Sequence, residues 1–176
     1  SVKYLEAHAE KYFSELQLKF ACSPENLRLG QSISTFNNPD RIVVGVREPE
    51  DKVILARLIS PITLNVEWMS VESAEITKHA INAFLATSIT FTNEIAAICE
   101  VVGANAKEVE RGLKSEIRIG HKAYVSPGGP FAGGTLARDI GFLHQIGKDA
   151  GLSTPVLSSV RPSNDEHKKW VRRKLM

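Results

Sequence analysis

The fold follows from a run that begins Ser73-Ala74-Glu75-Ile76-Thr77-Lys78-His79-Ala80-Ile81-Asn82 and continues to Val102 without a proline or a glycine. Ser73 is suited to be the N-cap of a helix, and Gly103 supplies a C-terminal stop. We therefore predict a single helix over 73–102. At 1.5 Å per residue its length is about 45 Å, well above that of an ordinary helix in a small domain.

Apolar side chains cover almost every side of this predicted helix. A helix that is apolar nearly all round must be covered nearly all round, and the other helices expected here are too few to do that. A second copy of the chain is a natural cover, so we expect a homodimer formed through helix 73–102. The apolar residues are Ile76, Ile81, Phe84, Leu85, Ile89, Phe91, Ile95, Ile98, Val101 and Val102.

The composition is that of a globular protein. The chain has 176 residues, of which 43% are hydrophobic and 24% are charged, and this suits one domain or one small domain with a partial neighbour. The formal net charge of +2 is too small to indicate a nucleic-acid partner. We interpret the basic residues at 168–174 as a solvated helix end, because no aromatic platform or recognition motif accompanies them.

Cysteine usage and hydropathy indicate a cytoplasmic protein. Cys22 and Cys99 lie far apart in the sequence, so neither a disulfide framework nor a zinc site is expected, and a reducing compartment is the default. We recognise no signal peptide and no apolar run of membrane length. The expectation is a cytoplasmic protein with neither a membrane nor a nucleic acid as partner.

The first part of the chain indicates half of a parallel α/β sheet. The β-branched run over 41–46 is typical of a strand buried in such a sheet. Three strands cannot easily bury both faces of a parallel sheet, so we expect the natural chain to be longer at its N-terminus. The predicted elements are a helix over 2–16, a strand over 18–22, a strand over 41–46, a helix from Pro49 to Ile59 and a strand over 62–66.

The rest of the chain is predicted to be helical. A short helix over 105–113 starts from an Asn105 cap, and a loop rich in glycine and proline over 126–134 leads to a helix over 136–150. A last helix starts near Thr154, is interrupted at Pro162 and resumes through Trp170 and Val171. The expected division is a partial α/β part at 1–68 and a helical part at 69–176.

Two polar residues of the long helix are not explained by hydrophobic periodicity. Lys78 and Asn82 lie four residues apart and therefore share a face. An ammonium and an amide that project together are suited to stabilise an alkoxide or a tetrahedral oxyanion. The alternative is that Lys78 extends to solvent while Asn82 bonds a neighbouring backbone group. These residues alone leave both interpretations open.

The remaining candidates are weaker. Asp139 is suited either to orient a water or a base or to complement the dipole of the helix in which it lies. Backbone amides at Gly133 and Gly134 precede that helix and are placed to hold an anion, but such loops more often simply turn. The five histidines do not have the spacing of metal ligands, so no metal site is expected.

Three spaced motifs stand out: SPENLRLG at 23–30, SAEITKHAINAF at 73–84 with Asn93-Glu94-Ile95, and Arg118-Ile119-Gly120 followed by FAGGTLARD at 131–139. Taken together, they resemble the nucleotide-sugar 6-dehydrogenases, which are the UDP-glucose and GDP-mannose dehydrogenase family. The order and spacing of these motifs extend the resemblance over nearly the whole chain. The segment at 164–168 also resembles the one that leads out of the family's central domain.

The resemblance implies a fold and an activity. The fold is mainly α, with a helical dimerisation domain like the C-terminal domain of 6-phosphogluconate dehydrogenase at 69–176. The end of a Rossmann-like NAD-binding domain precedes it at 1–68. The implied activity is NAD-dependent oxidation of the primary alcohol of a nucleotide sugar to a carboxylate, through a cysteine-bound intermediate. The implied cofactor is NAD, and the implied partners are the nucleotide sugar and a second copy of the chain.

The resemblance also implies roles for individual residues. In catalysis, Lys78 and Asn82 match the oxyanion-stabilising pair, Asp139 matches the aspartate that supports the catalytic water, and Glu25 matches a glutamate of the active-site loop. For the substrate, Arg118 matches an arginine that reaches the sugar of the neighbouring subunit, while Tyr124, Phe131, Gly133 and Gly134 are expected at the sugar pocket. The resemblance also implies that Glu25 and Arg138 belong to the cofactor-binding site.

Some positions depart from the family pattern. Thr135 stands where the family has its nucleophilic cysteine, Leu29 where many members have a second glutamate, and Arg138 where they have a lysine. A threonine hydroxyl is a far poorer nucleophile than a thiol at neutral pH, and no activating base is apparent beside it. The dinucleotide fingerprint is absent from the sequence, so this chain alone should not hold NAD tightly.

These departures leave two functions of different class. The chain is either a fragment or a degenerate member of the dehydrogenase family, inactive by itself, or a non-catalytic dimerisation module. Such a module would pair with itself or with an intact dehydrogenase subunit. In the second case it would contribute Arg118 to the site of that subunit.

Overall fold

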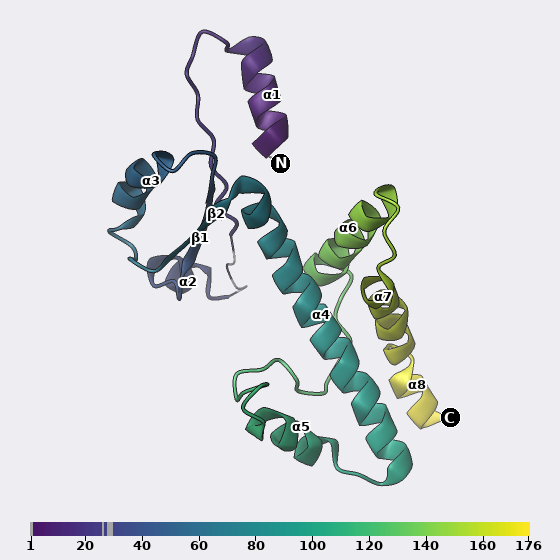
Figure 1. Cartoon of the computed structure of the whole chain (residues 1–176). Coiled ribbons are helices and arrows are strands. Elements are labelled where there is room, and N and C mark those ends of the chain that lie inside the picture. Colours follow the sequence, from purple (N-terminus) through teal and green to yellow (C-terminus); the bar gives the residue numbers. More distant parts are fainter. Residues whose placement is uncertain (1, 26, 28–29) are drawn as a thin grey trace. The chain divides into compact units, whose positions relative to one another are not determined.

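The computed structural model describes residues 2–25, 27 and 30–176, and it divides into two compact units, residues 1–78 and residues 79–176 (Figure 1). The described chain is mainly α with a small parallel sheet, as the sequence predicts. Its elements are α1 (Val2–Tyr12), α2 (Ser32–Asn37), β1 (Ile42–Val46), α3 (Asp51–Ile59), β2 (Val66–Ser70), α4 (Val71–Val102), α5 (Ala106–Ser115), α6 (Thr135–Asp149), α7 (Pro155–His167) and α8 (Trp170–Leu175).

The first unit is built on two parallel strands. β1 pairs with β2 in a register that runs from Ile42 opposite Val66 to Val46 opposite Ser70, and α3 forms the crossover between the strands. The side chains of Val43 and Val44 are almost fully buried, which is what a continuous β-branched run in a parallel sheet predicts. The predicted strand over 41–46 is therefore confirmed.

Two other predicted strands are wrong. Residues 62–65 form turns, because the amides of Ile62 and Thr63 both donate to the carbonyl of Ile59 at 2.8 and 3.1 Å and so prolong the end of α3. The strand that was expected there begins only at Val66. Residues 18–22 form no strand either, since only Cys22 bridges to Gly45, in the antiparallel direction.

The first helix is shorter than predicted. The apolar spacing over 2–16 predicts a helix to Leu16, whereas α1 ends at Tyr12. The last apolar residues of the predicted span, Phe13 and Leu16, are exposed, so little burial is available to extend the helix to them. The six-residue helix α2 was not predicted from the sequence, because its composition carries no hydrophobic periodicity.

Gly45 is a position where the sheet requires a glycine. A Cβ atom added there would lie 2.7 Å from the Cβ of Ala74, from the carbonyl oxygen of Ser70 and from the Cα of Val71. Two of these three atoms belong to the backbone and cannot rotate away. The first turn of α4 therefore packs directly on the backbone of β1.

We expect Gly45→Ala to destabilise the protein by about 1–3 kcal/mol or more, because backbone atoms must move to admit the added methyl group. Urea unfolding followed by circular dichroism measures this change. Gly141→Ala in α6 is the control, since the added Cβ would meet no described atom outside its own helix within 4 Å and the change gains helix propensity. Equal losses for the two variants would contradict this account of Gly45.

The long helix α4 begins earlier than predicted but ends where expected. It starts at Val71, and the hydroxyl oxygen of Ser70 accepts a hydrogen bond from the amide of Ser73 at 3.2 Å. Ser70, rather than Ser73, therefore performs the capping role. At the other end Gly103 has φ of +75°, and the amide of Ala104 donates to the carbonyl of Cys99 at 2.9 Å. This glycine stop confirms the predicted C-terminus.

Helix α4 is also long and apolar enough to cross a membrane. Its most apolar 18-residue window has a mean hydropathy of 1.3, so the expectation that no run reaches membrane length is wrong. The central helix of a folded domain has the same property, because it needs apolar residues on several faces to pack against its neighbours. Length and composition alone therefore do not distinguish the two environments.

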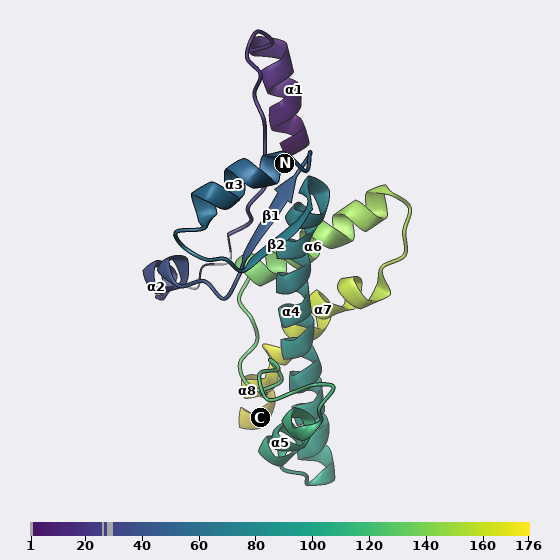
Figure 2. The ribbon, with the colours of Figure 1, turned by 60° about the vertical axis from the view of Figure 1, so that its left-hand side comes forward.

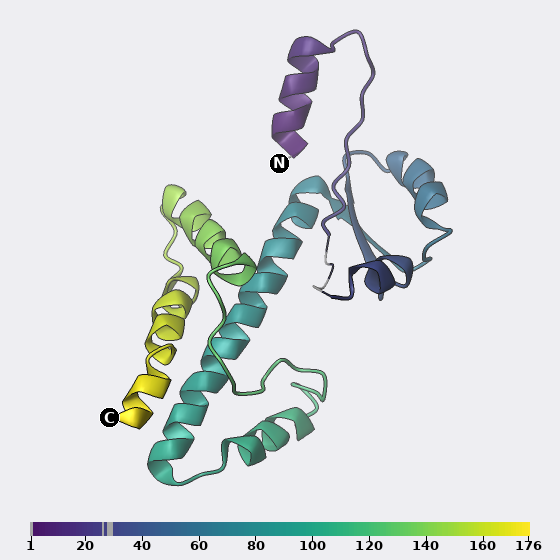
Figure 3. The same ribbon diagram turned by 180° about the vertical axis from the view of Figure 1, so that it is seen from behind.

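The second unit has one apolar core. Ala83 and Ala86 of α4 share this core with residues of α6 and α7, and α7 and α8 follow one another in line beside the C-terminal half of α4 (Figure 3). Figure 2 shows α5 beside the C-terminal end of α4. The buried core residues are Ala83, Ala86, Phe131, Ala137, Ile140 and Val160, and Ile89, Leu136, Leu143 and Leu157 pack against them.

The helices of the second unit follow the predicted order, with one correction. Asn105 caps α5 by accepting a hydrogen bond from the amide of Lys107 at 2.9 Å, as predicted. Pro162 does not interrupt α7, which runs through it to His167. Because Pro162 and Ser158 are both exposed, water can reach the Ser158 carbonyl that the proline leaves without a helical partner. The predicted resumption through Trp170 and Val171 corresponds to α8.

Candidate active site

Asp139 is a buried carboxylate in the first turns of α6. Its side chain is only 1% exposed, and three side chains surround it. Asn82 of α4 donates from Nδ2 to Oδ2 at 2.5 Å. His79 Nδ1, one helical turn earlier on α4, lies 3.3 Å from Oδ1, and Arg138 Nε lies 3.4 Å from the same oxygen. The sequence predicted Asn82 and Asp139 as site residues, and the structure brings them into direct contact.

These partners determine the protonation state of Asp139. Burial by itself would raise the pKa of this carboxyl group. The hydrogen bond from Asn82, the charge of His79 and the contacts of Arg138 and His79 act in the opposite direction, and the net result is a pKa below the ordinary value. Asp139 is therefore an anion at neutral pH, held inside the domain by a small set of donors.

We expect the stability that Asp139 contributes to depend on pH. Because its folded-state pKa is lowered, this contribution is complete above the ordinary aspartate pKa, near 4, and is lost as the pH falls through the folded-state value. Asp139→Asn is nearly isosteric but cannot ionise. The difference in unfolding free energy between wild type and variant should be largest near pH 7 and should shrink below about pH 4.

Urea unfolding of both proteins at several pH values between 3 and 7 measures this difference. Other carboxylates with lowered pKa values, such as Glu6 and Glu72, titrate equally in both proteins and cancel. A difference that stays constant with pH would show that folding does not lower the pKa of Asp139.

Glu25 and Lys78 form an ion pair within the first unit. Lys78 Nζ lies 3.7 Å from Glu25 Oε2, and the lysine side chain is partly buried. The loop that carries Glu25 is attached to the sheet by the hydroxyl of Ser23, which donates to the carbonyl of Val43 at 3.1 Å. The sequence predicted both charged residues, and the structure pairs them. Leu29, which stands where many family members have a second glutamate, lies outside the described residues.

The glycine-rich loop leads directly into α6. Gly133 and Gly134 are exposed, and the carbonyl of Gly134 accepts the amide of Arg138 at 3.0 Å, as the first bond of the helix. Thr135 is the first residue of α6, is exposed, and lies one helical turn before Asp139. Within the described part of the chain, no basic side chain is hydrogen-bonded to the Thr135 hydroxyl. Nothing in this structure therefore activates it as a nucleophile.

The predicted substrate residues are dispersed. Arg118 is exposed and its Nε donates to Glu116 Oε1 at 2.9 Å, while Tyr124 is exposed in the following loop. Neither residue contacts the Asp139 cluster in the described structure. The ring of Phe131 lies in the hydrophobic core, so within this chain its side chain packs the domain rather than facing a ligand.

Two buried asparagines that sequence reasoning missed hold the glycine-rich loop. Asn164 of α7 accepts from the Phe131 amide and donates to the Phe131 carbonyl, both at 2.9 Å. Asn93 of α4 accepts from the Gly128 amide at 2.9 Å. Their side chains are each 2% exposed. The available signal was an amide residue at a core-facing position of an amphipathic helix, since buried amides require partners.

The same loop borders a cavity of about 360 Å³ in the second unit. Its walls are formed by the loop residues 127–130, by Asn93 and Ala97 of α4 and by Trp170 of α8. Gly133 and Gly134, for which the sequence predicted a place at the sugar pocket, are not among the residues that line it.

The described residues do not provide a site for a metal or for a dinucleotide. No group of three or more histidine, cysteine or acidic side chains among them is arranged to hold a metal ion. The connection from β1 to α3, where a parallel α/β unit presents amides to phosphate, carries the buried carboxylate of Asp51, which pairs with Lys19 at 2.5 Å. A carboxylate at that helix N-terminus would repel a pyrophosphate, so these residues do not fit NAD.

Comparison with known protein families assigns the chain. Residues 72–166 match the model of the UDP-glucose/GDP-mannose dehydrogenase family, central domain. A UDP-glucose 6-dehydrogenase of Rickettsia bellii is 37% identical over 168 residues, which are 94% of this chain and 37% of that relative. The UDP-glucose 6-dehydrogenase TuaD of Bacillus subtilis is 37% identical over 154 residues, covering 88% of this chain and 33% of its own length.

Solved structures agree with this assignment. A UDP-glucose dehydrogenase of Pyrobaculum islandicum superimposes with a TM-score of 0.86 at 26% identity, covering 92% of this chain and 37% of that protein. A UDP-D-ManNAc dehydrogenase of Pyrococcus horikoshii has a TM-score of 0.77 at 17% identity, covering 94% and 39%, and this similarity concerns the fold alone.

The fold and the motifs place the chain in the class of nucleotide-sugar dehydrogenase domains. This chain belongs to the UDP-glucose/GDP-mannose dehydrogenase family. It spans about a third of the length of the curated relatives that it matches.

Proposed function

We propose that this chain is the central part of an NAD-dependent nucleotide-sugar 6-dehydrogenase of the UDP-glucose/GDP-mannose type. In this proposal it is either a fragment or a degenerate member of the family. The observation that supports it best is the contact between Asn82 and the buried, ionised Asp139. Burying a charge costs free energy that pairing and hydrogen bonds must offset, and a non-catalytic scaffold would have no use for a carboxylate buried together with Asn82 in this way.

In the proposed site each residue has a limited task. Lys78 supplies a partly buried ammonium, and Asn82 uses one N–H to hold Asp139 and keeps a second N–H for a developing oxyanion. Asp139 orients a water molecule through its carboxylate. NAD would accept the hydride, but the described residues do not form its site, so we derive no step through it. Other parts of such an enzyme would have to provide that site.

We propose further that this chain alone does not carry out the four-electron oxidation of a primary alcohol to a carboxylate. Thr135 lacks both the thiol and a base to activate its hydroxyl, which supports this proposal. Incubation of the protein with NAD and either UDP-glucose or GDP-mannose tests it by absorbance at the NADH band. We expect no steady NADH formation, and sustained formation with either sugar would overturn the proposal.

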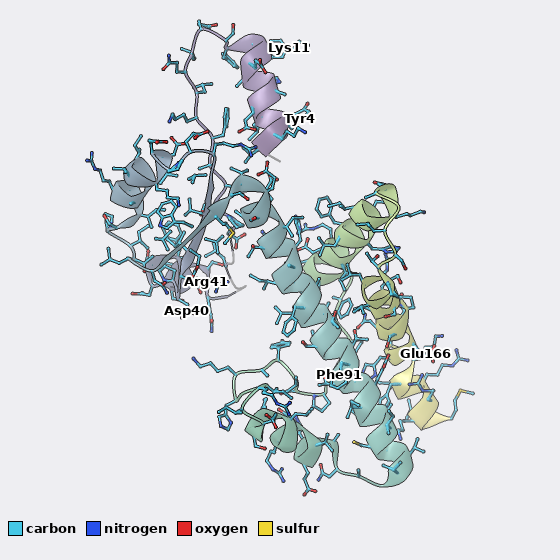
Figure 4. The ribbon with its side chains drawn as sticks, viewed as in Figure 1. Tyr4, Lys11, Asp40, Arg41, Phe91 and Glu166 are labelled. Atoms are coloured by element: carbon cyan, nitrogen blue, oxygen red, sulfur yellow. The ribbon has the colours of Figure 1, made fainter. Side chains whose placement is uncertain are left out.

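We propose a homodimer formed through helix 73–102. Phe84, Phe91 and Ile98 are spaced by seven residues on α4, and all three are exposed in the isolated chain, with Phe84 at 70% (Figure 4 labels Phe91). Sedimentation equilibrium of the wild type should give twice the mass of 19.4 kDa. Phe91→Glu should shift the protein to monomer, since it places a charge in the apolar interface, whereas Lys107→Glu on α5 should not.

We propose that the protein acts in the cytoplasm. There the complete enzyme would supply sugar acids for polysaccharide biosynthesis. The free cysteines Cys22 and Cys99 are compatible with a reducing compartment. An alternative function is a non-catalytic dimerisation module that pairs with an intact dehydrogenase subunit. Thr135 favours this alternative, and the exposed guanidinium of Arg118 is available to a neighbouring subunit.

The mass of the native protein in its source cells separates the main possibilities. An immunoblot band of two to three times 19.4 kDa would support a fragment of a complete enzyme. A band at 19.4 kDa would support the module.

A further inference from the structure

One carboxylate joins α8 to α4. Glu100 of α4 accepts a hydrogen bond on Oε1 from Trp170 Nε1 at 2.9 Å, and Lys174 Nζ lies 2.9 Å from its Oε2. Trp170 is the first residue of α8 and Lys174 belongs to its last turn, so Glu100 contacts both ends of this short helix. Among the described residues, every hydrogen bond and ion pair between α4 and α8 ends on Glu100.

Glu100 is an anion when it makes these contacts. The hydrogen bonds from Lys174 and Trp170 hold the pKa of its carboxyl group below the ordinary value. The charge of Arg173, also on α8, acts in the same direction. Arg173 itself pairs with Glu166 of α7 at 2.7 Å, so it does not join α8 to α4.

The apolar packing of α8 is slight. None of its residues is buried, and Val171 and Leu175 are exposed. Ion pairs at an exposed surface add little free energy, and an element with few buried contacts opens locally at low cost. We therefore expect α8 to detach from α4 more readily than α6, which has four buried residues.

Helix α8 also forms part of the wall of the cavity that the glycine-rich loop borders. Trp170 lines this cavity together with the loop residues 127–130. The Gly128 amide donates to Asn93, and the Gly128 carbonyl is bonded by Nε2 of His167 at 2.9 Å. Because a carbonyl only accepts, this ring nitrogen carries a proton. His167 is the last residue of α7, so the loop is bonded to the chain just before α8 begins.

We propose that α8 is a strap: Glu100 holds it against α4, and in this position it closes the cavity of about 360 Å³ and keeps the glycine-rich loop in place. Detachment of α8 opens the cavity and loosens the loop at Gly128. The importance of this loop for a sugar pocket rests on the proposed function, whereas the coupling between α8 and the loop is a property of the folded chain.

Glu100→Ala tests the strap, because it removes both contacts and leaves a strong helix former in α4. The first readout is the indole ¹H–¹⁵N signal of Trp170, with Trp68 of β2 as the internal reference. The second is hydrogen exchange at the Gly128 amide. We expect the Trp170 signal to move toward its position in an unfolded chain. Exchange at Gly128 should become about threefold to tenfold faster, as expected for the loss of a weak ion pair and a hydrogen bond.

Glu94→Ala is the matched control. Glu94 is also an exposed carboxylate of α4, but it accepts from the hydroxyl of Ser163 on α7. This variant should leave the Trp170 signal and the exchange at Gly128 at their wild-type values. Trp170→Phe separates the hydrogen bond from ring packing, since it keeps a ring at the cavity and removes the Nε1–H donor. Its exchange rate at Gly128 should lie between those of the wild type and Glu100→Ala.

Three results would overturn the proposal. If Glu100→Ala moves the Trp170 signal but leaves exchange at Gly128 unchanged, α8 does not hold the loop. If neither readout changes, Glu100 does not hold α8. If Glu94→Ala has the same effect as Glu100→Ala, the change follows from loss of any carboxylate on α4. None of these measurements requires turnover, so their outcome is independent of whether the chain belongs to an active enzyme.

Discussion

Thr135→Cys is expected to restore carboxylate formation in an enzyme that carries this chain as its central part. The suitable protein is a chimera in which this chain replaces the matching segment of the Bacillus subtilis relative, which is 37% identical to it. The rate of NADH formation from UDP-glucose should rise by roughly 10³-fold or more, because loss of a nucleophile has cost up to about 10⁶ in rate in a well-studied hydrolase. The physical reason is that a thiol ionises near neutral pH and a threonine hydroxyl does not.

Thr135→Ser is the matched control, since it changes the size of the side chain at the same position without supplying a thiol. It should leave the chimera as slow as the parent. If Thr135→Cys also fails while the chimera is folded and binds the nucleotide sugar, the rest of the site is not intact. The scaffold function would then replace the enzymatic one.

Asn164→Leu is expected to destabilise the second unit more than any other single change that we consider. The variant leaves the buried amide and the buried carbonyl of Phe131 without partners. Each unsatisfied backbone group costs about 1–3 kcal/mol, so the loss should be about 2–6 kcal/mol in total. Urea unfolding monitored by circular dichroism measures it. Loss of these two hydrogen bonds, the clamp on Phe131, should also make the glycine-rich loop more mobile. Faster amide hydrogen exchange at residues 126–134 would show this.

Ser163→Ala, one residue away on α7, is the control for the previous variant. The Ser163 hydroxyl donates to Glu94 at the exposed surface, so its removal should change stability by no more than about 0.5 kcal/mol. If Asn164→Leu costs as little as Ser163→Ala, the clamp on Phe131 does not contribute to the stability of the fold.

Much of the architecture could be predicted because it depends on local patterns. The absence of proline and glycine over 73–102 and the positive φ available to Gly103 specify α4 and its end. The β-branched run at 41–46 specifies β1 in the same way. The errors occur where tertiary contacts decide: Pro162 is tolerated in α7 because it faces solvent, and residues 18–22 form no strand because only Cys22 bridges to β1.

The candidate site, too, has features that the sequence predicts and features that only the tertiary structure decides. Lys78 and Asn82 stand out in the sequence because four-residue spacing on a helix is a local property, and the order of the motifs indicates the family that the comparisons show. What the chain alone does not reveal is which partner each polar group finds. His79, Asn93 and Asn164 look like ordinary helix residues until folding places Asp139, Gly128 and Phe131 beside them.

The physical reason is that these contacts join residues widely separated along the chain, such as Asn82 and Asp139, which lie 57 positions apart. Helical periodicity specifies which face a side chain occupies, but not which element covers that face. Burial then favours arrangements in which polar groups find partners, and those partners are brought close only in three dimensions. Local sequence patterns therefore account for the helices and for the family, while packing alone decides that Asp139 is a buried anion that accepts hydrogen bonds from Asn82 and Arg138.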